Sequence, residues 1–390
     1  MSSHEQPVKK ILMTTDTLGG VWQYSLELVE ALSAHDVGVS LATMGAPLSR
    51  RQRAAVVSLP NVTVHESSYK LEWMDEPWAD LRMAGKWLLG LETLLRPNVV
   101  HLNSYVHAAL RWKAPKLVVA HSCVYSWFAA VRHQKPPMHW HRYRKLVSEG
   151  LRRADAVTAP TGAMLSAVMK HYGPLPVGKK IYNARKPQDY NPEKKESFVL
   201  TAGRLWDEAK NISALERIAP RLKWPVYAAG DAAHPNGGTA AFNSLCVLGM
   251  LDDKELARWM SRSSLYALPA RYEPFGLSAL EAALSGCALV LGDIPSLREI
   301  WDDAALFVPP DDDSALEAAL NELIADNPLR TRLAQKARKR ALQFSPQRMA
   351  EEYLFLYQHL FSQTGKPRVR NRPRKSPSRA ADRRRKLRLQ

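Results

Sequence analysis

The sequence predicts an α/β protein made of two Rossmann-like domains that face each other across a cleft, and three observations carry this prediction. A chain of 390 residues exceeds the size that one hydrophobic core usually serves. Short apolar runs of strand character alternate with helical patterns, which indicates parallel sheets covered by helices. The alternation lapses at residues 184–197 into charged, proline-containing sequence that is typical of a linker. A ligand cleft between the two domains is then expected.

The first half opens with a strand, a glycine turn and a helix. The apolar run VKKILMT is followed by Gly19 and Gly20, and then by apolar residues at helical spacing from Trp22 to Leu32. Further strands, mostly separated by helical patterns, are expected at 37–43, 62–65, 98–102, 116–121 and 155–159. This order is typical of a parallel sheet whose crossovers are helices.

The second half has the same architecture without a repeated sequence. Its strands are expected at 198–202, 226–229, 265–268 and 288–291. Two helices are expected near the end, at 329–343 and 347–361, and they are separated by Ser345 and Pro346. Proline suits the first turn of a new helix. Because no repeat of fixed period occurs, we expect paired domains and not a solenoid.

Positive charge is concentrated at one end of the chain. The net charge is +17, and residues 365–390 carry +11 of it, with twelve Lys or Arg against one Asp. This segment offers almost nothing to bury, so we expect a disordered basic tail. The rest of the chain carries only +6, and with 46% hydrophobic residues overall most of it should fold.

Several classes of protein are excluded by the composition. No apolar run reaches the ~18 to 20 residues needed to cross a bilayer, and the N-terminal sequence MSSHEQPVKK has no apolar signal core. We therefore expect a cytoplasmic protein. The cysteines, Cys123, Cys246 and Cys287, are odd in number, widely spaced and without a CxxC pair. This pattern argues against both a disulfide framework and a structural zinc site.

The stretch RYEPFGLSALEAALSG is the most informative for chemistry. Seven residues separate Glu273 from Glu281, and a Pro-Phe-Gly turn precedes a helical pattern. The N–H groups of Phe275, Gly276 and Leu277 should lie near a helix N-terminus, where a nucleotide diphosphate would fit. Glu281 could accept hydrogen bonds from the vicinal hydroxyls of a ribose. The alternative is that Glu273 only complements the helix dipole and that Glu281 is solvated.

This stretch resembles the E-x7-E signature of glycosyltransferase family 4, and the resemblance covers roughly residues 8–362. It implies the GT-B fold, in which the C-terminal helix crosses back to the N-terminal domain. The implied acceptor domain comprises residues 1–185 with the helix 346–362. The implied donor domain, which would bind the nucleotide sugar, comprises residues 186–345.

The resemblance also implies roles for charged residues of the second half. Glu273 would face the transferred sugar, and Glu281 would bind the nucleotide ribose. The segment AGRLWDEAKN resembles the family's G-R-x-x-x-x-K-N element with an insertion, so Arg204 and Lys210 would neutralise charge on the departing diphosphate. Glu299, in GDIPSLREI, resembles another position near the donor. Taken singly, these cations could also be ordinary surface residues, and Glu299 an ordinary residue of an amphipathic helix.

The first half would contribute a glycine loop and a histidine. Gly19 and Gly20 resemble the family's glycine loop, which lets the backbone approach the donor phosphates and the acceptor. His121 ends the apolar strand LVVAH at the sheet edge where open α/β sheets bind ligands. The family commonly has a histidine there followed by aspartate, whereas Ser122 follows here. Asn183 matches the asparagine that commonly ends the first domain, and we expect its role to be structural.

The acidic triplet Asp311 to Asp313 could suggest the metal-binding DxD motif of another glycosyltransferase fold. The triplet lies in a proline-led loop before the helical pattern SALEAALNEL. We therefore interpret Asp313 or Ser314 as the N-cap of that helix. No metal is expected, because Arg204 and Lys210 would supply the positive charge at the diphosphate. No other cofactor is expected, because the nucleotide sugar is a substrate.

The expected activity is that of a retaining, metal-independent hexosyltransferase in polysaccharide or glycolipid assembly. A sugar would pass from a nucleotide-diphosphate donor to a hydroxyl of a glycan, glycolipid or small molecule. The leaving phosphate would take the acceptor proton, so no general base is needed. Two alternatives stay open, a nucleotide-sugar epimerase and a non-catalytic scaffold of the same fold that holds nucleic acid with its basic tail. Nucleic acid is not the partner that we expect.

Residues 132–153, RHQKPPMHWHRYRKLVSEGLRR, interleave basic side chains with Trp140 and Tyr143. This pattern suits weak contact with an anionic membrane at its inner face, assisted by the tail 365–390. It would also suit single-stranded nucleic acid, on whose bases the aromatic rings could stack. An exposed charged helix without a partner is the third interpretation.

Overall fold

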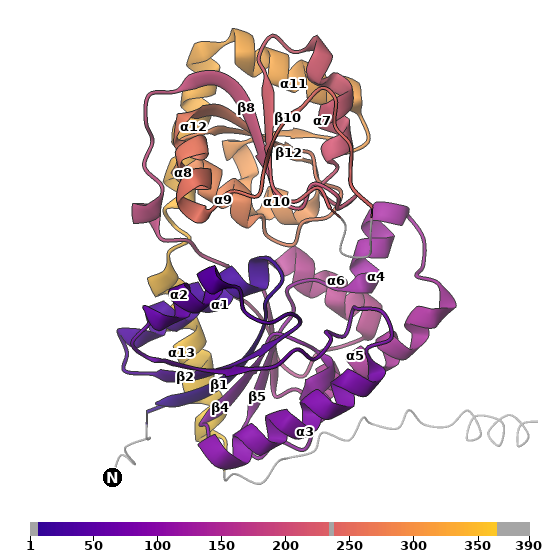
Figure 1. Cartoon of the computed structure of the whole chain (residues 1–390), viewed down its shortest axis with the longest axis vertical. Coiled ribbons are helices and arrows are strands. Elements are labelled where there is room, and N and C mark those ends of the chain that lie inside the picture. Colours follow the sequence, from indigo (N-terminus) through magenta and orange to yellow (C-terminus); the bar gives the residue numbers. More distant parts are fainter. Residues whose placement is uncertain (1–6, 234–237, 365–390) are drawn as a thin grey trace, which may run out of the picture.

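The computed structural model describes residues 7–233 and 238–364. The basic tail expected at 365–390 lies outside the described residues. Figure 1 shows two α/β units stacked along the long axis of the molecule, each built on its own sheet. The predicted fold class, two Rossmann-like domains, is confirmed.

The first sheet is formed by seven parallel strands in the order β3-β2-β1-β4-β5-β6-β7. Strands β4, β5 and β6 are buried along their whole length, as expected where helices cover both faces. The strands are β1 (Lys10–Asp16), β2 (Gly38–Met44), β3 (Val62–Glu66), β4 (Val99–Leu102), β5 (Lys116–Val119), β6 (Ala156–Ala159) and β7 (Gly178–Lys180).

Helices of the first half flank this sheet. Helix α1 (Gly20–Ser33) buries Tyr24, Leu28 and Leu32 on one face, which follows from their spacing of four residues. The other helices are α2 (Arg50–Val57), α3 (Trp78–Leu95), α4 (Val124–Trp127), α5 (His141–Arg153) and α6 (Gly162–Tyr172). Short helical turns lie at η1 (Val106–Ala109), η2 (Phe128–Arg132) and η3 (Met138–Trp140).

The second sheet is formed by six parallel strands in the order β10-β9-β8-β11-β12-β13. They are β8 (Glu196–Ala202), β9 (Val226–Ala229), β10 (Cys246–Gly249), β11 (Ser263–Leu268), β12 (Ala288–Gly292) and β13 (Leu306–Val308). The helices are α7 (Ile212–Ile218), α8 (Asp253–Arg262), α9 (Leu277–Leu284), α10 (Pro295–Trp301), α11 (Asp313–Ala325) and α12 (Asn327–Ala341). Short turns are η4 (Pro187–Asp189), η5 (Ala219–Arg221) and η6 (Asp302–Ala304).

The last helix, α13 (Pro346–Ser362), returns to the first unit, as the resemblance implied. Ser345 caps it by accepting a hydrogen bond from the N–H of Arg348, and Pro346 occupies the first turn as expected. Tyr353 and Tyr357 of α13 are buried in the same core as Ile11 of β1. In Figure 1 the yellow α13 accordingly lies beside β1 and β2.

The sequence-based expectations included the edge strand β3, at 62–65, but missed the other three edge strands. Strands β7, β10 and β13 lie at sheet edges, contain three or four residues each, and were not expected from the apolar pattern. A short edge strand is solvated on one side, so it needs no continuous apolar run.

The carboxyl ends of the strands in both sheets meet at the interface between the units. A Cβ added to Gly20, after β1, would lie 3.6 Å from Cδ1 of Leu277 at the start of α9. The N–H of Cys123, after β5, donates to the hydroxyl of Tyr272, after β11, at 3.2 Å. Open α/β sheets bind ligands at these ends, so the interface is the place to look for a site.

Candidate active site

The turn before α9 is organised around the carboxylate of Glu273. Gly276 precedes the helix with a left-handed φ of 91°, a conformation that favours glycine. The Oε1 atom of Glu273 accepts from the N–H of Phe275 at 3.3 Å and of Gly276 at 3.0 Å. Two of the three N–H groups expected to bind phosphate therefore donate to Glu273 in this structure.

Lys210 reaches the same carboxylate from the loop after β8. Its ammonium forms an ion pair with Oε2 of Glu273, and both side chains are largely buried. Asn211, next in sequence, anchors the loop, because its side-chain amide donates to the carbonyls of Pro269 at 3.0 Å and Pro310 at 2.7 Å. The structure thus brings together Glu273, which the resemblance assigned to the transferred sugar, and Lys210, which it assigned to the departing diphosphate.

Arg204 belongs to the same loop, but its contacts differ. Its guanidinium donates to Oδ2 of Asp207 at 2.6 Å, and half of the side chain is exposed. The ring of Trp206 lies 5.3 Å from the guanidinium carbon. Asp207 in turn accepts from the indole N–H of Trp127 of the first unit at 3.5 Å. Arg204 is therefore positioned at the interface without contacting Glu273.

Asp16 is a residue of the site that the sequence-based reasoning missed. It ends β1 directly before the glycine loop, and it accepts from the N–H of Leu18 at 3.2 Å. Burial raises the pKa of Asp16 to about 7, although the Leu18 N–H and the charge of Arg204 act in the opposite direction. Its position at the carboxyl end of a central strand was the sequence feature that could have identified it as a site residue.

Glu281 is buried on α9, and its carboxylate forms an ion pair with Arg185. The Nε of Arg185 donates to its Oε1 at 2.6 Å. Burial raises the pKa of Glu281, and the charge of Arg185 partly offsets this effect. Arg185 lies in the segment expected to be a linker, and no sequence feature indicated that it would pair with Glu281.

His121 follows β5, is half-buried, and contacts polar and aromatic side chains of the first unit. Its Nε2 contacts Oδ1 of Asn103 at 2.8 Å, and its ring packs edge-on against Tyr24 at 4.6 Å. Burial, with a smaller effect from His101, lowers the pKa of His121 to about 3. The imidazole is thus neutral at pH 7, and the carboxamide oxygen requires the proton to be on Nε2. Neutral His121 can donate or accept a hydrogen bond but supplies no cation.

Glu299 of α10 and Asn183 lie apart from this arrangement. The carboxylate of Glu299 accepts from the N–H groups of Gly162 and Ala163, each at 2.9 Å, at the N-terminus of α6. It also accepts from the hydroxyl of Tyr182 at 3.2 Å. Glu299 thus joins the two units, and the structure does not bring its carboxylate to Glu273. Asn183 is buried beside the linking segment.

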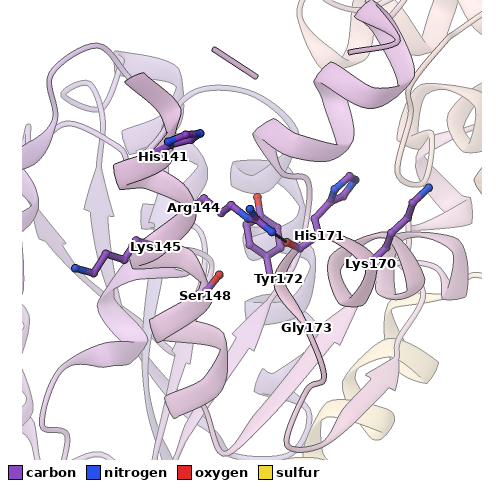
Figure 2. A pocket seen from close by; sticks show the side chains of 8 residues that line it. All are labelled: His141, Arg144, Lys145, Ser148, Lys170, His171, Tyr172 and Gly173. Atoms are coloured by element: carbon purple, nitrogen blue, oxygen red, sulfur yellow. Dashed lines mark hydrogen bonds between the residues drawn. The ribbon is translucent and has the colours of Figure 1, made fainter. Parts of the chain in front are cut away.

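One part of the basic segment 132–153 forms an exposed surface, and another part belongs to the core of the first unit. Tyr143 is buried, so the expectation that its ring could stack on nucleic-acid bases is wrong, whereas Trp140 packs against the same core and is only half-buried. Burial in the core is the physical reason. Figure 2 shows the basic side chains of α5 and of the end of α6 around a cavity of about 580 Å³. It is lined by His141, Arg144, Lys145, Ser148, Lys170, His171, Tyr172 and Gly173.

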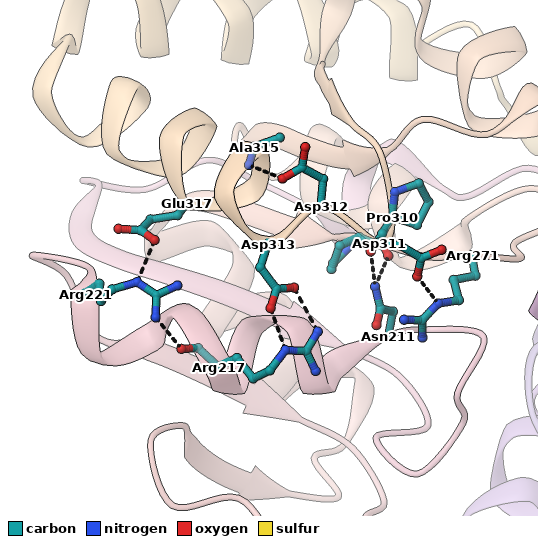
Figure 3. Close-up of polar contacts among 11 residues, drawn as sticks. Asn211, Arg217, Arg221, Arg271, Pro310, Asp311, Asp312, Asp313, Ala315 and Glu317 are labelled. Atoms are coloured by element: carbon teal, nitrogen blue, oxygen red, sulfur yellow. Dashed lines mark hydrogen bonds and ion pairs between the residues drawn. The ribbon is translucent and has the colours of Figure 1, made fainter.

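The acidic triplet is engaged in structural contacts, as Figure 3 shows. Asp312 is the N-cap of α11, because its Oδ1 accepts from the N–H of Ala315 at 2.9 Å. The expected cap, Asp313 or Ser314, is therefore wrong by one residue or two, since the helix begins earlier. Asp313 instead accepts two hydrogen bonds from Arg217, and Asp311 accepts one from Arg271 at 2.7 Å.

Two further properties concern the described residues as a whole. Within 7–233 and 238–364, His, Cys, Asp and Glu nowhere gather in a group of three that could hold a metal ion. In the same ranges, none of the helices is both long enough and apolar enough to span a bilayer.

Comparison with known families gives a consistent result for both halves. Residues 18–182 match the model of Glycosyltransferase Family 4, and residues 239–340 match that of Glycosyl transferases group 1. The O-antigen chain mannosyltransferase RfbU of Salmonella typhimurium is 23% identical over 330 residues, which cover 78% of this chain and 87% of that protein.

Two other similarities are more limited in identity or in extent. A glycogen synthase of Mycobacterium tuberculosis is 39% identical over 95 residues, so the matched part of this chain spans only 23% of that enzyme and 24% of this one. The crystal structure of Anabaena HepE in complex with UDP-glucose superposes with a TM-score of 0.69 at 17% identity. It covers 89% of this chain and 98% of that one, which supports the shared fold.

Proposed function

Because this chain belongs to the glycosyltransferases of the GT-B fold, we propose that it transfers a sugar from a nucleotide-diphosphate donor to a hydroxyl group of a glycan, glycolipid or small molecule. The observation that carries the proposal is the pairing of Lys210 with Glu273 at the N-terminus of α9, opposite Gly20. A cation and two oriented N–H groups thus converge on one carboxylate at the interface.

In the proposed reaction, the bond between the anomeric carbon and the diphosphate breaks while the acceptor oxygen attacks from the same face. Configuration is retained, and the leaving phosphate takes the acceptor proton. Lys210 and Arg204 stabilise the negative charge that develops on the diphosphate, together with the N-terminus of α9. Positive side chains suffice for this task, so the proposal requires no metal. Glu273 would contact the sugar, and Glu281 the ribose.

The two hydrogen bonds to Glu273 fit this scheme. A carboxylate held by the N–H groups of Phe275 and Gly276 keeps one orientation, and Lys210 balances its charge in a buried place. His121, neutral at pH 7, would serve as a hydrogen-bonding group toward the sugar and not as an acid. The acceptor would enter from the first unit, whose glycine loop lies opposite α9.

Donor binding is tested with a panel of nucleotide sugars that differ in base and sugar. At a concentration of about 100 times Kd, a bound donor should stabilise the protein by about 2.7 kcal/mol, which raises the melting temperature by several degrees. Differential scanning fluorimetry of the wild type and of Glu281→Ala would measure this shift. We expect one base to stabilise the wild type and to lose most of its effect on the variant. Absence of stabilisation by every nucleotide sugar would argue against the proposal.

We also propose weak, salt-sensitive attachment to anionic membranes through the basic surface around α5 and the end of α6. Lys145 and Lys170 extend outward on either side of the cavity in Figure 2. The pKa of His171 is lowered, mainly by burial and further by the positive charges of Lys170 and Arg144. The effect of these two charges is consistent with a net positive potential there. Each basic residue near an anionic surface contributes about 1 kcal/mol.

Liposome sedimentation tests this attachment. The full chain should sediment with vesicles rich in phosphatidylserine, should be released as salt rises, and should stay in solution with purely neutral vesicles. Lys145→Glu combined with Lys170→Glu should lower the bound fraction at least tenfold. Arg332→Glu combined with Lys339→Glu, two exposed changes in α12 with the same total change of charge, should lower it much less. Equal recovery with neutral and acidic vesicles would discard the idea.

A further inference from the structure

Arg185 occupies the point where the chain passes from one unit to the other. Its backbone N–H donates to the carbonyl of Phe344 at 3.3 Å, so the segment leaving the first unit touches the segment returning to it. Its side chain is only 3% exposed. A buried guanidinium at such a junction must find its partners within the protein.

Those partners come from both units. The Nε atom donates to Glu281 of α9 at 2.6 Å, whereas an Nη atom donates to the carboxamide oxygen of Gln23 in α1. The other Nη atom lies 3.7 Å from Oε1 of Glu27, one turn further along α1. One guanidinium thus bridges α9 in the second unit and α1 in the first.

The carboxylates of Glu281 and Glu27 both lie near Arg185, but their contacts with its guanidinium differ in length. Glu281 receives a short, charge-assisted hydrogen bond, which is among the stronger interactions of its kind. Within the described residues, Oε2 of Glu27 is buried and has no hydrogen-bond partner. A buried, charged carboxylate oxygen without a hydrogen-bond partner destabilises the folded protein. A closer approach of Arg185 would therefore stabilise Glu27 in its charged form.

The attraction between Glu27 and Arg185 depends on whether Glu27 is protonated, and therefore on pH. Burial raises the pKa of Glu27 to about 7, and Arg185 and Lys186 act in the opposite direction. Asp189 and Glu30, which also face it, raise the pKa further. Glu27 is therefore mostly neutral below pH 7 and mostly charged above it, where it attracts Arg185 most strongly.

Glu281 has a different set of neighbours. Burial of its carboxylate raises its pKa, and the charge and hydrogen bond of Arg185 act in the opposite direction. Tyr190 also hydrogen-bonds to it, and the charge of Asp253 acts to raise its pKa. A shift of the guanidinium toward Glu27, which now lies 3.7 Å away, would lengthen the hydrogen bond from its Nε to Glu281, the carboxylate that would accept the ribose hydroxyls.

We propose that Arg185 is a positioning residue for donor binding, which orients Glu281 toward the nucleoside while Glu27 competes for the same guanidinium from the first unit. The inference rests on the proposed role of Glu281 in binding the ribose. It adds that the affinity for the donor nucleotide depends on a residue of the linking segment and on a carboxylate of α1, neither of which touches the donor.

The test uses the full chain, the nucleoside diphosphate that binds the wild type, and the corresponding nucleotide sugar. Arg185→Lys keeps the charge but loses the geometry, so the donor KM should rise about tenfold to a hundredfold while kcat changes less than threefold. In the wild type, the Kd for the nucleoside diphosphate should rise several-fold between pH 6 and pH 8, as Glu27 ionises.

Glu27→Gln removes the competing charge while keeping the shape of the side chain. It should flatten this pH dependence and hold the Kd near its low-pH value. Glu351→Gln, the same change at an exposed position of α13, is the matched control and should keep the slope. Calorimetric titration across this pH range measures both.

The outcomes separate this inference from the proposed function. A wild-type donor KM in Arg185→Lys, or an unchanged pH profile in Glu27→Gln, overturns the role of Arg185 while leaving sugar transfer intact. A wild type that binds none of the nucleotides overturns both. The Glu27→Gln arm decides the matter even where changes at Arg185 impair folding.

Discussion

Replacing Lys210 with alanine should lower kcat by about 10²- to 10³-fold, the usual effect of removing one preorganised group that stabilises transition-state charge. The ammonium of Lys210 contacts Glu273 in a largely buried place, where electrostatic interactions are stronger than in water. Because the diphosphate gains further negative charge as its bond to the sugar breaks, and Lys210 should stabilise that added charge most, kcat and kcat/KM should both fall. Steady-state release of nucleoside diphosphate, in the presence of the acceptor, measures both constants.

Two comparisons make the Lys210 result specific. Arg204→Ala should also lower kcat but less steeply, because half of that side chain is solvated. Lys254→Ala, an exposed lysine on α8 of the same unit, should leave kcat unchanged. A Lys210→Ala enzyme with more than a third of the wild-type kcat would contradict the proposed stabilisation of the leaving group.

The second large effect concerns the stability of the first unit. Gly150 of α5 packs against the backbone of Tyr105, and a Cβ at position 150 would lie 2.0 Å from the Tyr105 carbonyl oxygen. A backbone atom cannot move aside as a flexible side chain can, so Gly150→Ala must push α5 away from η1. Overpacking of this kind costs about 3 kcal/mol, and the clash here is with backbone.

Gly90→Ala is the matched control for this substitution. Gly90 lies on an exposed face of α3, and a Cβ there would meet no atom within 4 Å. Alanine in a helix interior is favoured over glycine by about 0.5–1 kcal/mol, so this variant should be slightly more stable. Scanning calorimetry should therefore show the two changes moving the melting temperature in opposite directions. An unchanged melting temperature in Gly150→Ala would contradict the described packing of α5.

The interior of the fold could be predicted from the sequence because strands covered on both faces must be apolar throughout. Strands β4, β5 and β6 meet that condition. Edge strand β7, with the sequence GKK, carries no such signal, and its place depends on pairing with β6. Helix caps were predictable only to within a residue or two, because Asp311, Asp312 and Asp313 are chemically alike.

The residues of the candidate site also include some that were predicted from the sequence and some that were missed. Glu273 and Lys210 lie 63 positions apart, and their association was foreseen only through a resemblance to other proteins. Arg185 was missed because an arginine in a charged, proline-containing stretch looks like a solvated linker residue. Its burial results from the approach of α1 and α9, which no local pattern encodes. Asp16 was missed because a single acidic residue after a strand is common.

The return of α13 to the first unit has a consequence for how the protein is made. Met349, Tyr353 and Tyr357 are part of the core formed by β1 and α1, yet they follow the entire second unit in the chain. The ribosome therefore releases the second unit before it releases the residues that complete the first. Until then the nascent first unit leaves the place of these side chains uncovered, and assembly of the unit that begins the chain is finished last.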